Sequence, residues 1–581
     1  MKNALNKVRN LASVPLNKSI STSPGAATTE APNGPYRYVF GDVTANKLTY
    51  EPLEVPGQDP VPHLANKLDR VLFSPGVHFL KDPRTNVYNF DPKLEHIMSI
   101  TDFNFDQIPP YVPAGRDSKL SELALENQRT YTGSTSSLTP VLTQFHHALS
   151  HQRPPQILNL DKHFPGNLTS FSVVQRAPTE LWLKKSPKTG TYSVALGSNS
   201  SEVILTLLGQ AMEVMLTTEA SEFAKWSKHH PQNSEIETSQ GSTYNYTTSG
   251  PFLMRSQLDC HDPRLPGSGM FDLKTRACCA VRHDMDFAQI KDGSDYSINK
   301  LTGQYESFSR EFYELVRSAM FKYSLQARIG RMDGIFVAYH SIKRLFGFEY
   351  LPLTEIDKIY HTAQLVPEEP LKMVDHRRDE DVDTRMSNVA TVIADQEFRL
   401  SVDLLSKLFD YLRENVPLMK GTDSPDIKMM IHCDGPGSLA VFAQRGNYQN
   451  EALEKPEPDA PKHMRGFRVH FRQSINNRFV PVTRYPSLHE DSDQWRVSAS
   501  IMMMSKAELQ TRYKETLSSM RKLELVTEPV TDKSLQPHEQ AELLSKLPEA
   551  TKFQEVLRKY DQKGSEYFKW DALREKIELR D

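Results

Sequence analysis

The stretch 255–277, RSQLDCHDPRLPGSGMFDLKTRA, decides the fold. Two partly apolar segments flank a Leu-Pro-Gly-Ser sequence that fits a type II turn with positive φ at Gly267, so the stretch predicts a β-hairpin. Asp272 and Lys274 are two residues apart, and side chains at that spacing point to the same face of a strand. Charged groups on a buried strand are costly unless a cation or a substrate joins them. The hairpin is therefore the first place to look for a functional site.

The length of the hairpin loop determines which further acid joins this pair. With a two-residue loop at the Pro-Gly turn, Asp259 lies opposite Lys274 and diagonal to Asp272, so all three share one face. A three-residue loop would place Asp262 on that face instead. We expect Asp259 rather than Asp262. The alternative, a charged hairpin exposed to solvent, is disfavoured by the many apolar residues in both strands.

Length and composition set broad limits. The 581 residues leave room for roughly two to four domains. A net charge of −3 and a pI near 6.7 provide no global basic field for binding nucleic acid. The four cysteines form no CxxC pair and have no histidines at zinc spacing, so a reducing compartment is expected. No apolar run reaches the roughly 18 residues of a membrane-spanning helix, which predicts a protein without an integral span.

The N-terminal segment, residues 1–33, is basic and rich in serine and threonine. It carries four basic side chains and no acid before Glu30, and apolar residues recur at helical spacing beside the basic ones. These features are typical of a mitochondrial presequence. An ordinary disordered basic tail is the alternative.

The remaining chain is expected to contain four further segments. Helix signals occupy 134–151, about 200–226 and about 304–329. Strand signals occupy 171–176 (FSVVQR), 180–185, 191–196 and 334–340 (GIFVAYH). The predicted segments are an extended, β-rich region (34–190), a core (191–350), a C-terminal helical and β region (351–525) and a charged helical tail (526–581).

The order of helix, strands, helix and strand around D-x12-D-L-K resembles the PD-(D/E)XK nuclease superfamily, especially its RecB-like branch. The stretches 72–92 (LFSPGVHFLKDPRTNVYNFDP), 252–277 and 322–340 also resemble the fungal mitochondrial RNA 5′-processing and degradation proteins. The resemblance covers about 70–350. Leu258 stands where the superfamily motif often has proline. The resemblance implies an α/β (α+β) fold, a restriction-endonuclease-like core with a mixed sheet flanked by helices, and large N- and C-terminal additions.

The resemblance also implies the chemistry of the hairpin. One or two Mg²⁺ or Mn²⁺ ions would be held by Asp259, Asp272 and the backbone carbonyl of Leu273. Lys274 would orient or help to deprotonate the attacking water, or neutralise the phosphate. A further acid normally comes from the preceding helix, where Glu213 is our choice.

Several site residues remain open between two interpretations. Glu202 and Glu219 compete with Glu213, although Glu202 has a structural explanation as part of a capping arrangement. The RecB-like pattern implies a polar residue on the helix after the hairpin, for which Gln326 is the candidate with Tyr323 beside it. A helix-surface role or an ordinary buried hydrogen bond is the alternative for Gln326. Arg255 could hold a phosphate or form a structural ion pair.

A second basic stretch, 462–484, contains no acid. Apolar and basic residues alternate along 467–472, so one strand could bury an apolar face and present a basic one. Such a face suits a phosphate backbone, with aromatic rings nearby for stacking bases. An amphipathic strand whose arginines only face water is the alternative. The predicted RNA-binding residues are Arg255, Arg465, Arg468, Arg472 and Arg478.

Two functions are therefore considered. The first is a metal-dependent mitochondrial ribonuclease, a 5′-to-3′ exoribonuclease in RNA 5′-end processing and turnover, with direction, RNA choice and organelle implied by the resemblance. The second is a noncatalytic RNA-binding or regulatory protein on a nuclease scaffold. Expected partners are single-stranded RNA 5′ ends and the mitochondrial RNA polymerase or RNA-decay machinery. The expected location is the mitochondrial matrix, with peripheral inner-membrane association possible.

Overall fold

The computed structural model describes most of the chain between Arg37 and Thr527. The described residues are 37–156, 160, 164, 170–196, 204–232, 242–283, 296–362, 379–418, 424–448, 459–481 and 493–527. The predicted presequence and nearly all of the predicted tail lie outside them. Within the described part, no helix has the length and apolar character needed to cross a membrane.

A large, mostly antiparallel sheet joins strands from distant parts of the sequence. Its order is β1-β17-β15-β14-β13-β5-β6-β4-β8-β7-β2, with β16 paired to β15. Segments from the predicted N-terminal, core and C-terminal regions thus share one sheet, so those ranges are stretches of sequence rather than separate compact units. The bounds in sheet order are β1 (Arg37–Thr44), β17 (Trp495–Met503), β15 (Arg465–Ile475), β14 (Ser438–Arg445), β13 (Ile427–Gly435), β5 (Thr179–Lys185), β6 (Tyr192–Leu196), β4 (Tyr131–Ser134), β8 (Phe252–Gln257), β7 (Tyr244–Ser249), β2 (Glu51–Leu53) and β16 (Arg478–Phe479).

A smaller mixed sheet carries the hairpin. Its order is β3 (Val77–Phe79), β12 (Leu345–Pro352), β11 (Gly334–His340), β10 (Met270–Ala277) and β9 (Cys260–His261). β10 and β11 run parallel, whereas β9 pairs with β10, and β12 with β11, in antiparallel fashion. Every residue of β11 is buried, as its nearly continuous apolar sequence predicts for a central strand.

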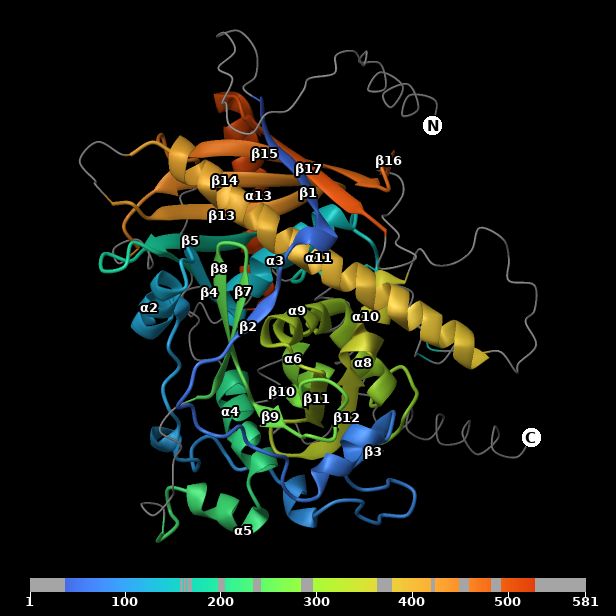
Figure 1. Ribbon diagram of the computed structural model, residues 1–581. Helices are drawn as coiled ribbons and strands as arrows, with labels where there is room; N and C mark the ends of the chain where they lie inside the picture. The colour runs from blue at the N-terminus through green and yellow to red at the C-terminus, as the bar shows by residue number, and fades with distance from the viewer. Residues whose placement is uncertain are drawn as a thin grey trace, which may run out of the picture. The chain divides into compact units, whose positions relative to one another are not determined.

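Helices cover both faces of this smaller sheet (Figure 1). Phe271 and Leu273 of β10 pack with the apolar side of α4 (Ile204–Thr217), and Ile335 and Val337 of β11 pack with α8 (Phe308–Ser318) and α9 (Met320–Gly330). The alternation of side chains along each strand produces these two layers. The predicted α/β class, a mixed sheet flanked by helices, is confirmed.

Both long predicted helices are interrupted. The helix predicted at about 200–226 ends at Thr217 and is followed by a short helix, α5 (Ala220–Phe223), because Glu219 adopts an extended conformation. The second is divided at Ala319 into α8 and α9. Of the predicted strands, 171–176 contains turns instead, with the Arg176 N–H donating to the Ser172 carbonyl at 3.2 Å. The other three predicted strands correspond to β5, β6 and β11. The helix predicted at 134–151 corresponds to α3 (Thr135–Leu149).

The hairpin differs from its predicted register by two residues. Cys260 pairs with Phe271, a register that places Asp259 opposite Asp272 rather than Lys274. The predicted type II turn is wrong, because the loop is wider and the glycine with positive φ is Gly269, at 78°. A shift of two residues preserves the faces of a strand, so Asp259 remains on the side predicted for it.

Asp333 explains the wider loop. Its carboxylate accepts the backbone N–H groups of Ser268 at 2.9 Å and Gly269 at 2.8 Å. The strand before the loop is also divided. β8 belongs to the large sheet and β9 to the small one, so the chain passes from one sheet to the other between Gln257 and Cys260. Asp259 lies in this passage.

A buried carboxylate connects three helices elsewhere in the fold. Glu397 of α11 (Asp379–Asn415) contacts His146 of α3, the His361 Nε2 of α10 (Leu353–His361) at 3.3 Å and the Arg153 Nη2 at 3.1 Å. Burial lowers the pKa of both histidines, that of His361 to about 3. Burial alone would raise the pKa of Glu397, but His146 and Arg153 lower it well below its usual range. Glu397 is thus an ionised, fully engaged buried group.

Replacing Glu397 with alanine should therefore destabilise the protein by about 3–5 kcal/mol, because it leaves Arg153 buried without its carboxylate. The matched control is Asp403→Asn on the same helix, where the partner is the half-buried Lys407. That change should cost about 0.5 kcal/mol or less. Urea unfolding of both variants tests the difference, and equal losses would contradict the central role of Glu397.

Candidate active site

The candidate site forms where β9 separates from β10. Their pairing involves only Cys260–His261 and Met270–Phe271, so the edge of β10 beyond Phe271 is left for another partner. The Asp259 side chain takes that place, with its Oδ2 accepting the backbone N–H of Leu273 at 3.1 Å. This hydrogen bond holds the Asp259 carboxylate beside the strand that carries Asp272 and Lys274.

Lys274 lies between the acids. Its Nζ is 2.7 Å from both Asp272 carboxylate oxygens and 3.4 Å from the Leu273 carbonyl oxygen. The Tyr323 ring of α9 lies on another side, with its centroid 5.3 Å from Nζ. Burial lowers the pKa of Lys274, but the attraction of Asp272 and Asp259 outweighs it, so the pKa is raised overall. The amine is therefore held as an ammonium group.

Glu213 approaches from α4. Burial raises its pKa to about 7, with Asp272 acting in the same direction and Lys274 opposing it. Burial also raises the pKa of Asp259 well above its usual value, and the nearby Asp272 and Glu213 add to the effect. The structure thus brings together four of the predicted site residues: Asp259, Asp272, Lys274 and Glu213.

This set of donors fits a hard divalent cation. Three carboxyl groups and the Leu273 carbonyl are oxygen ligands, which Mg²⁺ and Mn²⁺ prefer. When ionised, the three carboxylates exceed the single positive charge of Lys274 by two. Burial raises the pKa of both Glu213 and Asp259, and the neighbouring Asp272 and Glu213 raise that of Asp259 further. A divalent ion would supply the missing positive charge.

The competing acids have other partners or lie outside the described residues. Glu219 Oε1 accepts the Asn66 N–H at 3.1 Å, near the start of α5. Asp262 is hydrogen-bonded to Arg264, with 2.9 Å from Nε to Oδ1, and this bond lowers its pKa. Glu202 lies outside the described residues. Among the described candidates, only Glu213 interacts with Asp272 and Lys274.

On α9, the residue that contacts Lys274 is Tyr323 rather than the predicted Gln326. Tyr323 contacts Lys274, whereas Gln326 lies one helical turn further along. The Gln326 Oε1 is buried and accepts no hydrogen bond from the described residues. Gln326 thus stays a candidate, one helical turn from the Tyr323 contact with Lys274.

Arg255 forms a structural ion pair, which was the alternative to binding a phosphate. It is buried in β8, forms an ion pair with Asp117 and donates to the Val112 carbonyl at 2.5 Å. Its guanidinium also lies 4.4 Å from the Tyr244 ring centroid. These contacts engage the Arg255 guanidinium with Asp117, Val112 and Tyr244.

The predicted basic strand is β15, and its alternation is as expected. Phe467, Val469 and Phe471 are buried. Arg468 on the opposite face is half-buried and pairs with Glu508 of α13 (Lys506–Thr527), which covers this end of the strand. The exposed arginines are Arg465, Arg472 and Arg478, and Arg472 lies 5.2 Å from the Phe479 ring centroid.

Two further cations lie on the elements that carry the site: Lys322, one of the polar residues that the sequence offers on the helix after the hairpin, and Arg276, which the sequence analysis missed. Burial, and then repulsion from Lys274, lowers the pKa of Lys322. Burial and repulsion from Arg282 lower that of Arg276 to about 10. Arg276 continues the alternation of Asp272 and Lys274 along β10, a signal that was available in the sequence. Lys322 interacts electrostatically with Asp272 and Lys274, whereas the charged groups that act on Arg276 are Arg282, Glu311 and Glu314.

A second group could also hold a metal ion. His146, His361 and Glu397 each offer one ligand atom, and these atoms lie within 4.8 Å of one another. Two imidazoles with one carboxylate suit Zn²⁺ or a transition metal rather than Mg²⁺. The contact of Arg153 with Glu397 opposes an additional cation there. The hydrogen bonds of Glu397 to His146, His361 and Arg153 explain this group as a structural connection between helices.

The comparisons identify the family. A model described as "Mitochondrial protein Pet127" matches residues 111–410, just over half of the chain. The chain therefore belongs to the Pet127 family of mitochondrial proteins, which confirms both the predicted family and the predicted mitochondrial location.

Two curated relatives extend this result. A Saccharomyces cerevisiae protein, "Putative mitochondrial translation system component PET127", is 36% identical over 381 residues, covering 61% of this chain and 46% of the relative. A Schizosaccharomyces pombe protein, "mRNA degradation protein pet127, mitochondrial", is 32% identical over 375 residues, covering 63% and 66%. The chain thus matches about half to two thirds of the length of these relatives.

Solved structures of Scheffersomyces stipitis Rai1 resemble the chain only distantly. One, in complex with (3′-NADP)⁺ and a calcium ion, has a TM-score of 0.28 and 10% identity over 70% of this chain and 90% of Rai1. The other has a TM-score of 0.27 and 11% identity, covering 67% and 88%.

The raised pKa of Glu213 predicts how stability depends on pH. Its folded value of about 7 exceeds the ordinary value of 4.5, so its contribution is present below pH 4.5 and is lost as pH rises through 7. We expect the metal-free protein to lose on the order of 1–3 kcal/mol over this range. Glu213→Gln should flatten the profile. Chemical unfolding in EDTA from pH 5 to 8 measures it, and parallel profiles for the two proteins would refute the assignment.

Proposed function

We propose that this protein is a metal-dependent ribonuclease that degrades or trims mitochondrial RNA from its 5′ end. The observation that supports this function best is the group of Asp259, Asp272 and Glu213 around Lys274, in which Asp272 is buried and the other two acids are partly buried. Three carboxyl groups gathered in a largely desolvated position are unfavourable unless a cation is bound. A protein that used the fold only as a scaffold would have no need to maintain them.

The residues of the site would have two different roles, metal binding and contact with the phosphate or water. Asp259, Asp272, Glu213 and the Leu273 carbonyl would hold Mg²⁺ or Mn²⁺. Such an ion neutralises charge that develops on a phosphate and lowers the pKa of water. Because the acids keep Lys274 protonated, its ammonium group is suited to donate hydrogen bonds to a phosphate oxygen or to orient the attacking water. In this state it cannot accept the proton from that water.

The substrate and the direction rest on the family. The S. pombe relative is named an mRNA degradation protein and the S. cerevisiae relative a translation system component. Both names fit a protein that acts on mitochondrial RNA. The preference for single-stranded 5′ ends follows from the resemblance noted in the sequence, as does an association with the mitochondrial RNA polymerase or the RNA-decay machinery.

Removing the charge of Asp272 or of Lys274 tests their proposed role in RNA cleavage. Asp272→Asn and Lys274→Met should each reduce RNA cleavage by at least about 10²-fold, because they remove a metal ligand and a phosphate or water contact. The control is Asp262→Asn, in the same hairpin but paired with Arg264. Cleavage of 5′-labelled RNA in Mg²⁺ or EDTA is the measurement. Wild-type rates in folded Asp272→Asn would refute the proposal.

The basic strand makes a separate contribution to RNA binding. Replacing the exposed Arg472 with alanine should weaken binding and reduce the slope of log affinity against log salt by about 0.7, the value for one lost contact to a single strand. Arg468→Ala should have a smaller effect, since Glu508 already pairs with Arg468. Filter binding from low to moderate salt compares them. Identical slopes for wild type and Arg472→Ala would remove Arg472 from the RNA path.

A further inference from the structure

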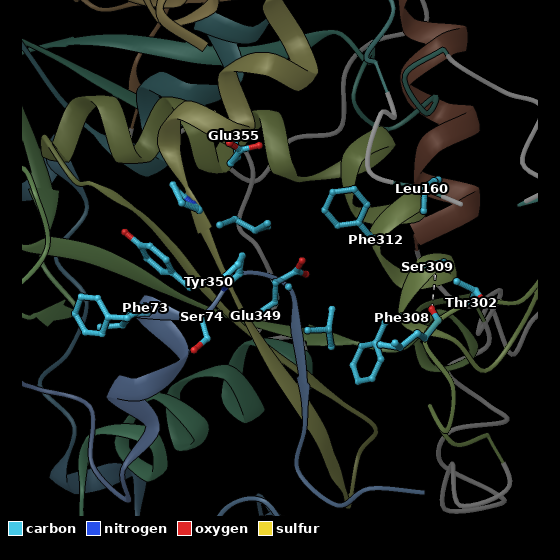
Figure 2. Close-up of a pocket in the computed structure, with 17 residues that line it drawn as sticks. Phe73, Ser74, Leu160, Thr302, Phe308, Ser309, Phe312, Glu349, Tyr350 and Glu355 are labelled. Atoms are coloured by element: carbon cyan, nitrogen blue, oxygen red, sulfur yellow. Dashed lines mark hydrogen bonds between the residues drawn. The ribbon is translucent and has the colours of Figure 1, made fainter. Parts of the chain in front are cut away.

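A cavity of about 630 Å³ lies at the opposite edge of the smaller sheet from β9. Its walls come from the helical turn η2 (Leu68–Phe73), the segment after it, β12 and α8. Figure 2 shows aromatic side chains on both sides of the space, among them Phe73, Tyr350, Phe308 and Phe312. Nothing in the proposed ribonuclease mechanism uses this cavity.

The charged side chains among the described lining residues are two acids, Glu349 and Glu355. Glu349 projects from β12 into the space between Tyr350 and Phe312, and Glu355 lies at its upper rim (Figure 2). Glu355 is partly exposed and pairs with Lys358 at 2.8 Å. Glu349 is buried, and its hydrogen-bond partner among the described residues is the hydroxyl of Tyr339, which donates to Oε2 at 2.7 Å.

Glu349 belongs to neither of the two groups that could hold a metal. Lys274, Val337 and Glu349 form one row across the strands β10, β11 and β12. Two strand spacings, about 9–10 Å, therefore separate Glu349 from Lys274 along the sheet. Burial raises the pKa of Glu349 to about 7, as expected for a carboxyl group without a cationic partner. The cavity thus contains a carboxyl group that the fold does not neutralise.

We propose that this cavity binds a small organic cation that carries alkylammonium groups. An ammonium group would pair with Glu349, and the aromatic walls would contact both the cation and its methylene groups. The volume falls within the roughly 300–1,000 Å³ typical of small-molecule sites. The partly exposed Glu355 pairs with Lys358 through Oε1, and its second carboxylate oxygen can accept a further ammonium group at the rim. Spermidine is a suitable probe of this chemistry.

The test is calorimetric titration of the full chain with spermidine, without RNA and at constant ionic strength. Wild type should bind one spermidine per chain at this site, and Glu349→Gln should weaken binding by at least about tenfold. The glutamine keeps the size of the side chain and can still accept from Tyr339. Glu54→Gln, at an exposed position away from the cavity, is the matched control and should bind as wild type does.

A second variant makes the test independent of Glu349. Thr302 is an exposed lining residue, so Thr302→Trp should fill the mouth of the cavity and also abolish binding. Absence of spermidine binding to wild type would overturn the proposal. Wild-type affinity in both folded variants would overturn it as well, as would complete displacement of spermidine by an equal concentration of Mg²⁺. If Glu349→Gln does not fold, Thr302→Trp decides the outcome.

Discussion

The geometry of the candidate site depends on the hydrogen bond from the Leu273 N–H to the Asp259 carboxylate. It replaces strand pairing at the point where β9 separates from β10, and it holds an acid against the strand that carries Asp272 and Lys274. Glu213 completes the group from the helix on the other side of that strand. Three carboxyl groups, of which Asp272 is buried and the other two are partly buried, then share one ammonium group. Burial raises the pKa of both Glu213 and Asp259, and repulsion from neighbouring carboxylates adds to the rise at Asp259.

The passage of the chain between two sheets gives Asp259 this position. β8 is paired within the large sheet, and β9 pairs within the small one only a few residues later. Segments before residue 191 and after residue 350 supply most strands of the large sheet, and β8 of this sheet directly precedes Asp259. Farther away, Glu397 connects α3, α10 and α11 through buried hydrogen bonds. Segments outside residues 191–350 thus belong to the same fold that carries Asp259.

Local spacing predicted the part of the site that lies within one strand. Asp272 and Lys274 share a face because strands alternate, and Asp259 kept its predicted face because the register moved by two residues. The register itself could not be predicted, since Asp333, about 65 residues downstream, sets the width of the loop. The engagement of Arg255 by Asp117 and of Arg468 by Glu508 likewise arises from residues far away in the sequence. The cavity around Glu349 left no signal, because its walls come from separate segments.

The central claim is that the Asp259, Asp272 and Glu213 group binds a divalent metal ion. The most direct measurement is anomalous diffraction from crystals of the protein soaked in MnCl₂. The account predicts a manganese peak among these three carboxyl groups and none there in Asp272→Asn. A wild-type crystal with manganese only at His146, His361 and Glu397, or with no manganese bound by the chain, would contradict it.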